Sequence, residues 1–493
     1  MARSLRSWTN KLNREATEGA MGKRGTAIAR IARRPAFSPG AALLLYFAAG
    51  LAVAAPPDTG VDTATEASPA ALPRQTGDSV AVKSLLADDR MLLSWLKDNN
   101  KDVLAAATRV DQAMAALRQD RLHLNPSLSG SVSDLPLGDT NPPGLTPKDT
   151  AIYVTVLSQT VEIGKRGPRI ESARLRLESG RRLYLDVLGD TMAEARAVLG
   201  RVAYLGARQS VLEDSLASAQ QNVELQRSRV DNGDLSGNDF DRLLVDTMLL
   251  ESEVAANLRE SEAEVASCGA VLAAPCGVEE TGIDSVNGAA ALPEPGDIRT
   301  AIDRRPDIQA LMLERDAAGK DALLARRRRI PDPSLSLGYT HDNLTISGDQ
   351  PRTYLFSIGI PLPIFDRGQH DASRAEARAR ELELAAAGLR ERGRADVQAL
   401  QERRASLERT LDGLLEQAVP KSKGVLEATL GAVNRGGVSM TDLLLARRTH
   451  TDLLLKVMDL QFDLFAVRND LRRALGLDAD LARGSMTSSE VTP

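Results

Sequence analysis

The 493-residue sequence contains few of the residue types from which active sites and metal centres are built. It has only four His and two Cys, and aromatic residues make up 3% of the chain. Two Cys exclude a disulfide-dense scaffold, and four scattered His without ligand spacing give little material for a metal site. The formal net charge of −5 argues against nucleic-acid binding. With no nucleophile motif and no Gly-rich phosphate loop, we predict that the protein is not an enzyme and needs no cofactor.

Long apolar runs are also scarce, and the single one present lies near the N-terminus. Residues 41–55 read AALLLYFAAGLAVAA, follow several Arg, and end in a small-x-small site at 52–54. This pattern predicts a secretory signal peptide over residues 1–55, followed by a polar tail over 56–81. A membrane anchor is the alternative, but the run is shorter than the roughly 20 residues that a spanning helix needs. If the mature chain crosses a membrane, it is predicted to do so as β-strands.

The rest of the chain contains a tandem repeat. The segment NPSLS at 125–129 corresponds to DPSLS at 332–336, and NGDLS at 232–236 corresponds to RGGVS at 435–439. Two further landmarks follow the same order, at offsets of 201 to 207 residues. We therefore predict one repeat over 82–276, a Gly/Pro/acid-rich linker over 277–300, a second repeat over 301–476 and a polar tail over 477–493.

We expect each repeat to contain, in this order, a helix, a strand, a loop, a second strand, a long helix, a tight turn and a returning helix. In the first repeat we predict strands 125–133 and 151–161 around loop 134–150, then helices 168–231 and 237–272 joined by the turn 232–236. In the second we predict strands 333–341 and 353–361 around loop 342–352, then helices 369–434 and 440–475 joined by the turn 435–439. In strand 353–361, Tyr354, Phe356, Ile358 and Ile360 share one face.

The long helices carry a coiled-coil pattern. Leu188, Met192, Ala195, Leu199 and Val202 follow a 4-3-4-3 spacing, which is typical of side chains that pack into holes on a neighbouring helix. A helix of about 65 residues is ~98 Å long at 1.5 Å per residue.

The turns between the long helices have clear sequence signals. Gly233 and Gly436 can adopt the left-handed conformation that ends a helix. S-x-x-D spacing at Ser236 and at Ser439 predicts a capping box that begins each returning helix. Pro420 lacks a backbone N–H and should kink the second long helix.

Together these motifs resemble the TolC-type outer-membrane efflux proteins. The segments SQTVEIGKR at 158–166 and PLPIFDRG at 361–368 are similar to segments of the cobalt–zinc–cadmium resistance branch of that family. RPDI at 305–308 and IPDP at 330–333 also fit. The resemblance covers residues 82–476. One departure is the segment EIGK at 162–165, where the branch often has an additional Gly before the Lys.

The resemblance implies a mainly α fold with a small β part, in a homotrimer. Each protomer would give four strands to a 12-stranded barrel in the outer membrane of a Gram-negative bacterium, in contact with its lipid. The long helices would continue the barrel as a coiled-coil tunnel through the periplasm. The implied partners are a periplasmic adaptor (membrane fusion) protein and an inner-membrane RND pump, and the implied cargo is heavy-metal cations.

Two other functions are left open. A duct of the same family could serve drug or solvent efflux or type I protein secretion. A protein of a different class, a periplasmic coiled-coil scaffold without a pore, would share the long helices but has no need of the paired strands.

Candidate functional residues cluster near the two helix turns. Aligning the turn glycines places Glu224 opposite Glu427, and a ring of such carboxylates would favour cations; Asp231 is a further candidate. They could equally be solvated carboxylates of a coiled coil. The turn residues could contact the adaptor or only form the turn: Asn232, Gly233, Leu235, Ser236, Arg435, Gly436, Val438 and Ser439.

Two other features are noted in the sequence. Cys268 and Cys276 could form a disulfide in the periplasm or remain buried thiols. The basic run 326–329, at a helix end just before a strand, could complement the helix dipole or lie at a membrane rim.

Overall fold

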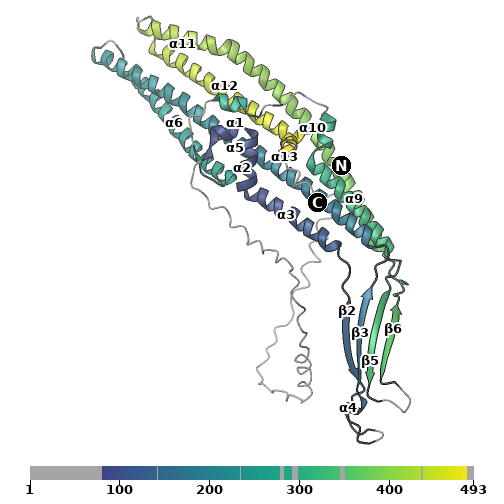
Figure 1. The fold of residues 1–493 in the computed structure, drawn as a ribbon. Helices are drawn as coiled ribbons and strands as arrows, with labels where there is room; N and C mark the ends of the chain where they lie inside the picture. Colours follow the sequence, from purple (N-terminus) through teal and green to yellow (C-terminus); the bar gives the residue numbers. More distant parts are fainter. Residues whose placement is uncertain are drawn as a thin grey trace, which may run out of the picture. The chain divides into compact units, whose positions relative to one another are not determined.

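A computed structural model describes residues 80–140, 143–233, 235–277, 283–290, 292, 298–344, 350–434 and 437–485. The predicted signal peptide and residues 56–79 of the N-terminal tail lie outside the described residues, as do Arg435 and Gly436. Figure 1 shows that the described chain consists of long helices and one small sheet. Among the described residues, no helix combines the length and the hydropathy that crossing a bilayer requires.

The repeats have matching helices. The first contains α1 (Val82–Ala87), α2 (Asp89–Asn99), α3 (Lys101–Asp120), α5 (Arg166–Asp231) and α6 (Gly237–Leu272). The second contains α8 (Ile298–Asp303), α9 (Pro306–Arg327), α10 (Gln369–Gly413), α11 (Val419–Asn434) and α12 (Met440–Leu475). In each repeat a long helix and a returning helix form a hairpin, and α5 of the first repeat packs against α12 of the second.

The first helix of each repeat is divided where a residue competes with the helix backbone. In the first repeat the side chain of Asp88 accepts a hydrogen bond from Arg90 N, and that of Asn100 accepts from Asp102 N and Val103 N. Each therefore ends one helix and caps the next. In the second repeat Pro306 begins α9 at a position where its missing N–H has no helical partner to lose.

The second long helix is interrupted near Pro420. A π-helical turn, Leu414–Ala418, separates α10 from α11. Because Pro420 cannot donate a hydrogen bond to the carbonyl of Glu416, the backbone immediately before it loses a helical bond and widens. The segment predicted as one helix over 369–434 is thus two α-helices joined by a π turn.

The four long strands form one antiparallel sheet in the order β2-β3-β5-β6. They are β2 (Ser127–Ser133), β3 (Ile152–Thr160), β5 (Ser334–Asp342) and β6 (Arg352–Gly359). Each repeat contributes one hairpin, and β3 pairs with β5 to join the two hairpins. A short helix, α4 (Pro147–Thr150), lies in the loop between β2 and β3.

The core lies where the repeats meet along α5. The predicted stripe is buried: Leu188, Met192, Ala195, Leu199 and Val202 are each at most 1% exposed. They pack with residues of α1, α2, α7 (Ile283–Gly288), α12 and α13 (Leu477–Ser485). The 3.5-residue apolar period therefore identified the inward face of α5 correctly.

Several smaller elements complete this core. β1 (Val80–Ala81) pairs in parallel with β4 (Cys276–Gly277). β1 lies in the segment predicted as the polar N-terminal tail, and β4 lies where the first repeat meets the predicted linker. Residues 477–485 were predicted to begin a polar tail but form helix α13 (Leu477–Ser485). α13 packs on α5 because Ala479 and Ala482 are buried and Asp478 is paired inside the protein.

Candidate functional site

The sheet has two chemically different faces. On one, register places Leu128, Leu157, Leu337 and Phe356 in a single row across all four strands. On the other, the adjacent row consists of Ser127, Ser158, Ser336 and Ser357, and the hydroxyls of Ser158 and Ser336 are 2.8 Å apart. The apolar face is not covered within the chain, because Phe356 is 81% exposed and Tyr354 is 76% exposed.

The outer strands of the sheet have free edges. Within the described residues, β2 and β6 each pair on one side only. An unpaired edge presents backbone N–H and C=O groups that need partners, above all where water is excluded. The sheet of a single chain is therefore suited to extension by the strands of other chains.

The turn of the first hairpin begins as predicted but lacks the capping box. Gly233 has φ +80°, which ends α5 in the left-handed region. Ser236 stands at the N-cap of α6 but makes no side-chain cap hydrogen bond, and Asp239 instead lies 3.6 Å from Arg242. The prediction of a capping box at Ser236 is therefore wrong.

The second hairpin has the capping box that the first lacks. The Ser439 hydroxyl accepts a hydrogen bond from Asp442 N, and the Asp442 carboxylate accepts from Ser439 N and Oγ. Asn232, Ser236, Val438 and Ser439 are exposed, whereas Leu235 is half-buried. The described turn residues are thus accessible in the chain.

Glu224 and Glu427 lie on the two long helices close to the turns. Both are exposed, and Glu224 lies 3.9 Å from Arg227 one turn later on the same helix. Among the described residues Glu427 makes no ion pair. α12 packs against both α5 and α11, and no hydrogen bond or ion pair joins the two carboxylates among the described residues. Asp231 is the exposed last residue of α5.

An ion pair that the sequence did not single out connects the two hairpins near their turns. Asp246 of α6 accepts from Arg447 of α12, whose side chain is 8% exposed. Close by, Arg242 Nη1 donates to Thr441 Oγ1 at 3.2 Å. The sequence does contain a signal for this ion pair. Arg447 falls on the same helix face as buried Met440 and Leu443, and a buried Arg within an apolar stripe needs a partner of opposite charge.

A buried charge cluster holds α2 and α13 against the core. Arg196 is 1% exposed and donates to Asp478 from both Nη atoms at 3.0 Å, and to Asp89 at 2.8 Å. Arg472 donates to the same two carboxylates at 2.8 and 2.7 Å. Burial alone would raise the pKa of Asp478, but the hydrogen bonds and charges of Arg196 and Arg472 lower it below the ordinary value.

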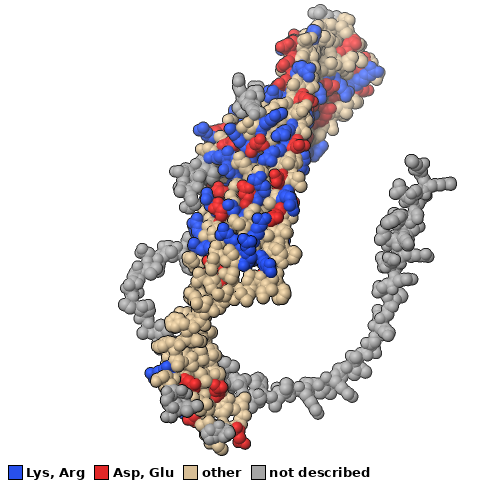
Figure 2. All heavy atoms as spheres, turned by 90° about the vertical axis from the view of Figure 1, so that its right-hand side faces the viewer, with Lys and Arg blue, Asp and Glu red and all other residues tan. Residues whose placement is uncertain are grey.

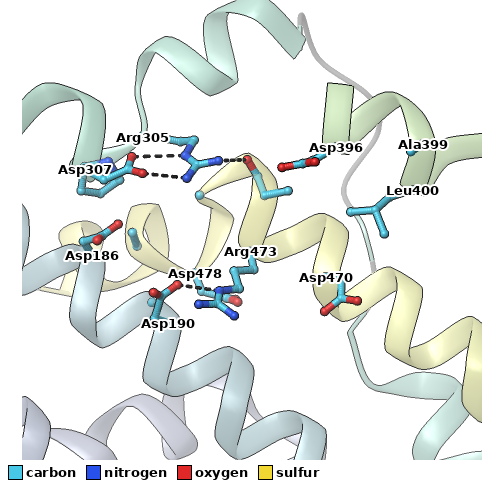
Figure 3. Close-up of a pocket in the computed structure, with 15 residues that line it drawn as sticks. Asp186, Asp190, Arg305, Asp307, Asp396, Ala399, Leu400, Asp470, Arg473 and Asp478 are labelled. Atoms are coloured by element: carbon cyan, nitrogen blue, oxygen red, sulfur yellow. Dashed lines mark hydrogen bonds and ion pairs between the residues drawn. The ribbon is translucent and has the colours of Figure 1, made fainter. Parts of the chain in front are cut away.

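A cavity of about 510 Å³ adjoins this cluster (Figure 3) and is lined mainly by carboxylates and two arginines. Asp186 and Asp190 come from α5, Arg305 and Asp307 from the start of α9, and Arg473 from α12. Arg305 Nη2 donates to Asp307 at 2.7 Å, and Arg473 Nε donates to Asp190 at 2.7 Å. Asp186 makes no ion pair with either arginine in the described structure.

The environment of Asp186 favours its neutral form. Burial, and next the negative charges of Asp307 and Asp190, raise the pKa of Asp186 to about 7, against the opposing effect of Arg305 and Arg473. Asp186 therefore keeps its proton to a higher pH than an ordinary Asp does. In the part of the chain that the structure describes, no group of His, Cys, Asp or Glu is arranged to hold a metal ion.

The two cysteines form a disulfide. Cys268 near the end of α6 is bonded to Cys276 of β4, eight residues later. The bond closes the loop that follows α6. At the end of α6, the carbonyl of Val271 accepts a hydrogen bond from the Asn100 side chain, and the carbonyl of Leu272 accepts one from the Trp95 side chain.

Comparison with known proteins relates this architecture to bacterial efflux channels. Residues 298–477 match the family model described as "Outer membrane efflux protein". The chain is 26% identical over 341 residues to the cobalt-zinc-cadmium resistance protein CzcC of Cupriavidus metallidurans, an alignment that covers 66% of this chain and 73% of CzcC. It is 26% identical over 282 residues to the nickel-cobalt-cadmium resistance protein NccC of Alcaligenes xylosoxydans xylosoxydans, covering 56% of this chain and 61% of NccC.

The fold also matches a solved structure. A crystal structure of CusC, studied for its folding and transmembrane channel formation, superimposes with a TM-score of 0.68 at 19% identity. The match covers 82% of this chain and 96% of the CusC chain. At this identity the likeness establishes the fold.

Proposed function

We propose that this chain, a member of the outer membrane efflux protein family by residues 298–477, is the outer-membrane exit duct of an efflux complex for heavy-metal cations. The observation that carries the proposal is the sheet. It has an exposed apolar face, a serine-rich opposite face and two free edges, and it continues into two long helical hairpins.

A homotrimer satisfies the geometry of this sheet. Three sheets of four strands would close into a 12-stranded barrel, in which β2 of one protomer pairs with β6 of the next. Closure would remove the free edges, which lipid does not tolerate. The row Leu128-Leu157-Leu337-Phe356 would then face hydrocarbon and the serine rows would face the lumen, which is the alternation of a membrane barrel.

The helical hairpins would continue the lumen into the periplasm. Their turns lie at the ends of α5 and α11, away from the strands (Figure 1). The duct itself would be passive, with energy supplied by an inner-membrane RND pump through a periplasmic adaptor.

The cargo class is inferred from the relatives, because CzcC and NccC are both named for resistance to divalent metals. Deletion of the gene should sensitise its host to one or more of zinc, cobalt, cadmium and nickel, and the intact gene should restore growth. Sensitivity only to dyes, solvents or antibiotics would keep the duct and contradict the metal cargo. If fractionation of the membranes finds no heat-sensitive trimer in the outer-membrane fraction, the proposal that the protein is an outer-membrane duct is contradicted.

We infer that Glu224 and Glu427 form a cation-selective ring near the periplasmic end. In a trimer they would supply six carboxylates, and Glu427 has no counter-charge among the described residues. In planar bilayers, Glu427→Gln should lower the K⁺ over Cl⁻ permeability ratio and weaken block by divalent cations. The matched control is Glu391→Gln on α10, also exposed and farther from the turn. Equal selectivity in the two variants would contradict the ring. Asp231 would contribute charge at the same end.

We propose that the turns contact the adaptor. The described turn residues Asn232, Ser236, Val438 and Ser439 are exposed. Gly233 and half-buried Leu235 would complete the surface, together with Arg435 and Gly436. A photo-crosslinking residue at Val438 should capture the adaptor encoded with this gene, whereas one at Ser252, exposed two-fifths of the way along α6, should capture it less. No product from any turn position would contradict the contact.

A further inference from the structure

The four crossings between helix and strand share one arrangement of residues. They lie between α3 and β2, β3 and α5, α9 and β5, and β6 and α10. Every crossing has an Arg on its helix side: Arg121, Arg166, Arg329 and Arg367. We call these crossings together the collar. Figure 2 shows Lys and Arg gathered where the helices end, beside a strand surface that carries little charge.

Each crossing also exposes apolar side chains between its Arg and its strand. Leu122, Ile163, Ile330 and Phe365 represent the four crossings, and Phe365 is 90% exposed. From strand to helix, each crossing therefore has exposed apolar side chains before its Arg. The carboxylates of Glu162 and Asp332 also lie there, and they are paired with Arg169 and Lys165.

Contacts between neighbouring crossings make the collar one continuous band. Arg166 Nη2 donates to the carbonyl of Arg121 at 2.6 Å, which joins the first crossing to the second. Arg327 Nη1 donates to the carbonyl of Gly164 at 2.6 Å, which joins the second to the third. At the fourth, Gly368 has φ +73°, and a Cβ there would lie 2.0 Å from the carbonyl oxygen of Ala325 on α9.

Within the described residues none of the four collar arginines pairs with a carboxylate, and three of the four are exposed. Arg326 and Arg328 pair with Glu376 and Asp371 on α10. Within the described residues Arg121, Arg329 and Arg367 are exposed and form no ion pair. Asp366, next to Arg367, accepts a hydrogen bond from Gly368 N at 2.8 Å.

We propose that the collar binds the phosphate headgroups of anionic phospholipids in the membrane leaflet on the helix side of the sheet, and so sets the depth of the barrel. The inference rests on the proposed outer-membrane function. An apolar belt followed by a guanidinium belt matches the order of hydrocarbon and phosphate in a leaflet. A protein partner would not require the same order at all four crossings. Each cation near an anionic surface strengthens binding by up to about fivefold.

The test is lipid selectivity at the protein boundary. The full-length trimer is reconstituted into phosphatidylcholine vesicles, and spin-labelled phosphatidylglycerol is compared with spin-labelled phosphatidylcholine by electron paramagnetic resonance. We expect the parent protein to prefer phosphatidylglycerol by about threefold or more, with most of the preference lost at 0.5 M salt because exposed charges are screened.

The decisive variant is R121Q/R329Q/R367Q, in which the preference should fall to about one. The matched control R259Q/R394Q/R409Q removes the same charge from exposed positions of α6 and α10 that lie far along the chain from the collar and should keep the parent preference. An unchanged preference in the collar variant, or none in the parent, would overturn the proposal. So would a preference for lipid A over phosphatidylglycerol, because lipid A belongs to the opposite leaflet.

Failure of the proposed function has a different result. A protein that does not insert as a heat-sensitive trimer in any vesicle would contradict the outer-membrane duct. A trimer that inserts and conducts ions but shows no lipid selectivity would contradict only the collar.

Discussion

Removing the Asp478 carboxylate should release α13 from the helices around it. The carboxylate and its partner Arg196 are each 1% exposed. Arg196 contacts both oxygens at 3.0 Å, and Arg472 adds bonds of 3.1 and 2.8 Å. In Asp478→Ala, the buried guanidinium of Arg196 would lose one of its two carboxylate partners and keep Asp89, which is 30% exposed and also pairs with Arg472, so an excess positive charge would remain buried.

The cost of such an unpaired buried charge is about 3–5 kcal/mol. At about 1.4 kcal/mol per tenfold change, opening of α13 should become roughly a hundredfold to several thousandfold more frequent. Hydrogen exchange of the peptide that contains α13 measures this opening in the assembled protein. The control is Asp480→Ala on the same helix, which removes a surface pair with Arg483 and should change exchange only slightly. Exchange in Asp478→Ala within about threefold of the parent would refute the reasoning.

A double variant separates charge from packing. Arg196→Met with Asp478→Leu removes both members of the pair and fills similar volume, so it should restore most of the protection of α13. The pH dependence follows from the lowered pKa of Asp478. The folded carboxylate remains ionised below the pKa of the unfolded chain, so its stabilisation is complete above that pKa and is lost as pH falls through the folded pKa.

Three further predictions concern the helices. Gly200→Ala should lower the melting temperature, because a Cβ there would lie 2.2 Å from the ring of buried Phe465 and overpacking costs about 1–3 kcal/mol; Gly180→Ala on the same helix, with its nearest atom at 3.9 Å, should not. Asp186→Asn should raise the melting temperature more at pH 8 than at pH 5. Because the folded pKa of Asp186 is raised to about 7, the stability of the parent is full below the unfolded pKa and falls as pH rises through the folded pKa. An equal shift at both pH values would contradict this. Replacing both cysteines by serine should speed hydrogen exchange of residues 268–277, because a disulfide that closes a loop of this length stabilises the folded state by about 2–3 kcal/mol. Unchanged exchange would show that the disulfide contributes nothing to local stability there.

Local patterns in the sequence predicted the local structure well. The apolar period identified the buried face of α5, and Gly233 marked the end of that helix. The alternation in 353–361 identified the residues that share a face of β6. These signals depend on a residue and its neighbours within a few turns or strand positions, so one sequence is enough to read them.

Contacts between distant segments could not be predicted in this way. Asp478 and Arg196 are 282 residues apart, and each looks like an ordinary surface charge in its own segment. The same holds for β1 and β4, whose pairing joins Val80 to Cys276. Residues 477–485 appeared to be a polar tail because their stabilising partners lie on α5 and α12. The two predicted capping boxes show another limit, because the same S-x-x-D spacing forms a box at Ser439 but not at Ser236.

The exposed apolar face of the sheet connects the sequence to assembly. Strand alternation predicts that such a face exists but not what covers it, because soluble hairpins alternate in the same way. In the described chain no helix packs extensively on the sheet, so Phe356 and Leu337 remain open. A soluble two-layer protein would cover this face with its own helices or a second sheet. Its exposure beside two free strand edges is accounted for if the strands of further copies pair with the edges and lipid covers the face.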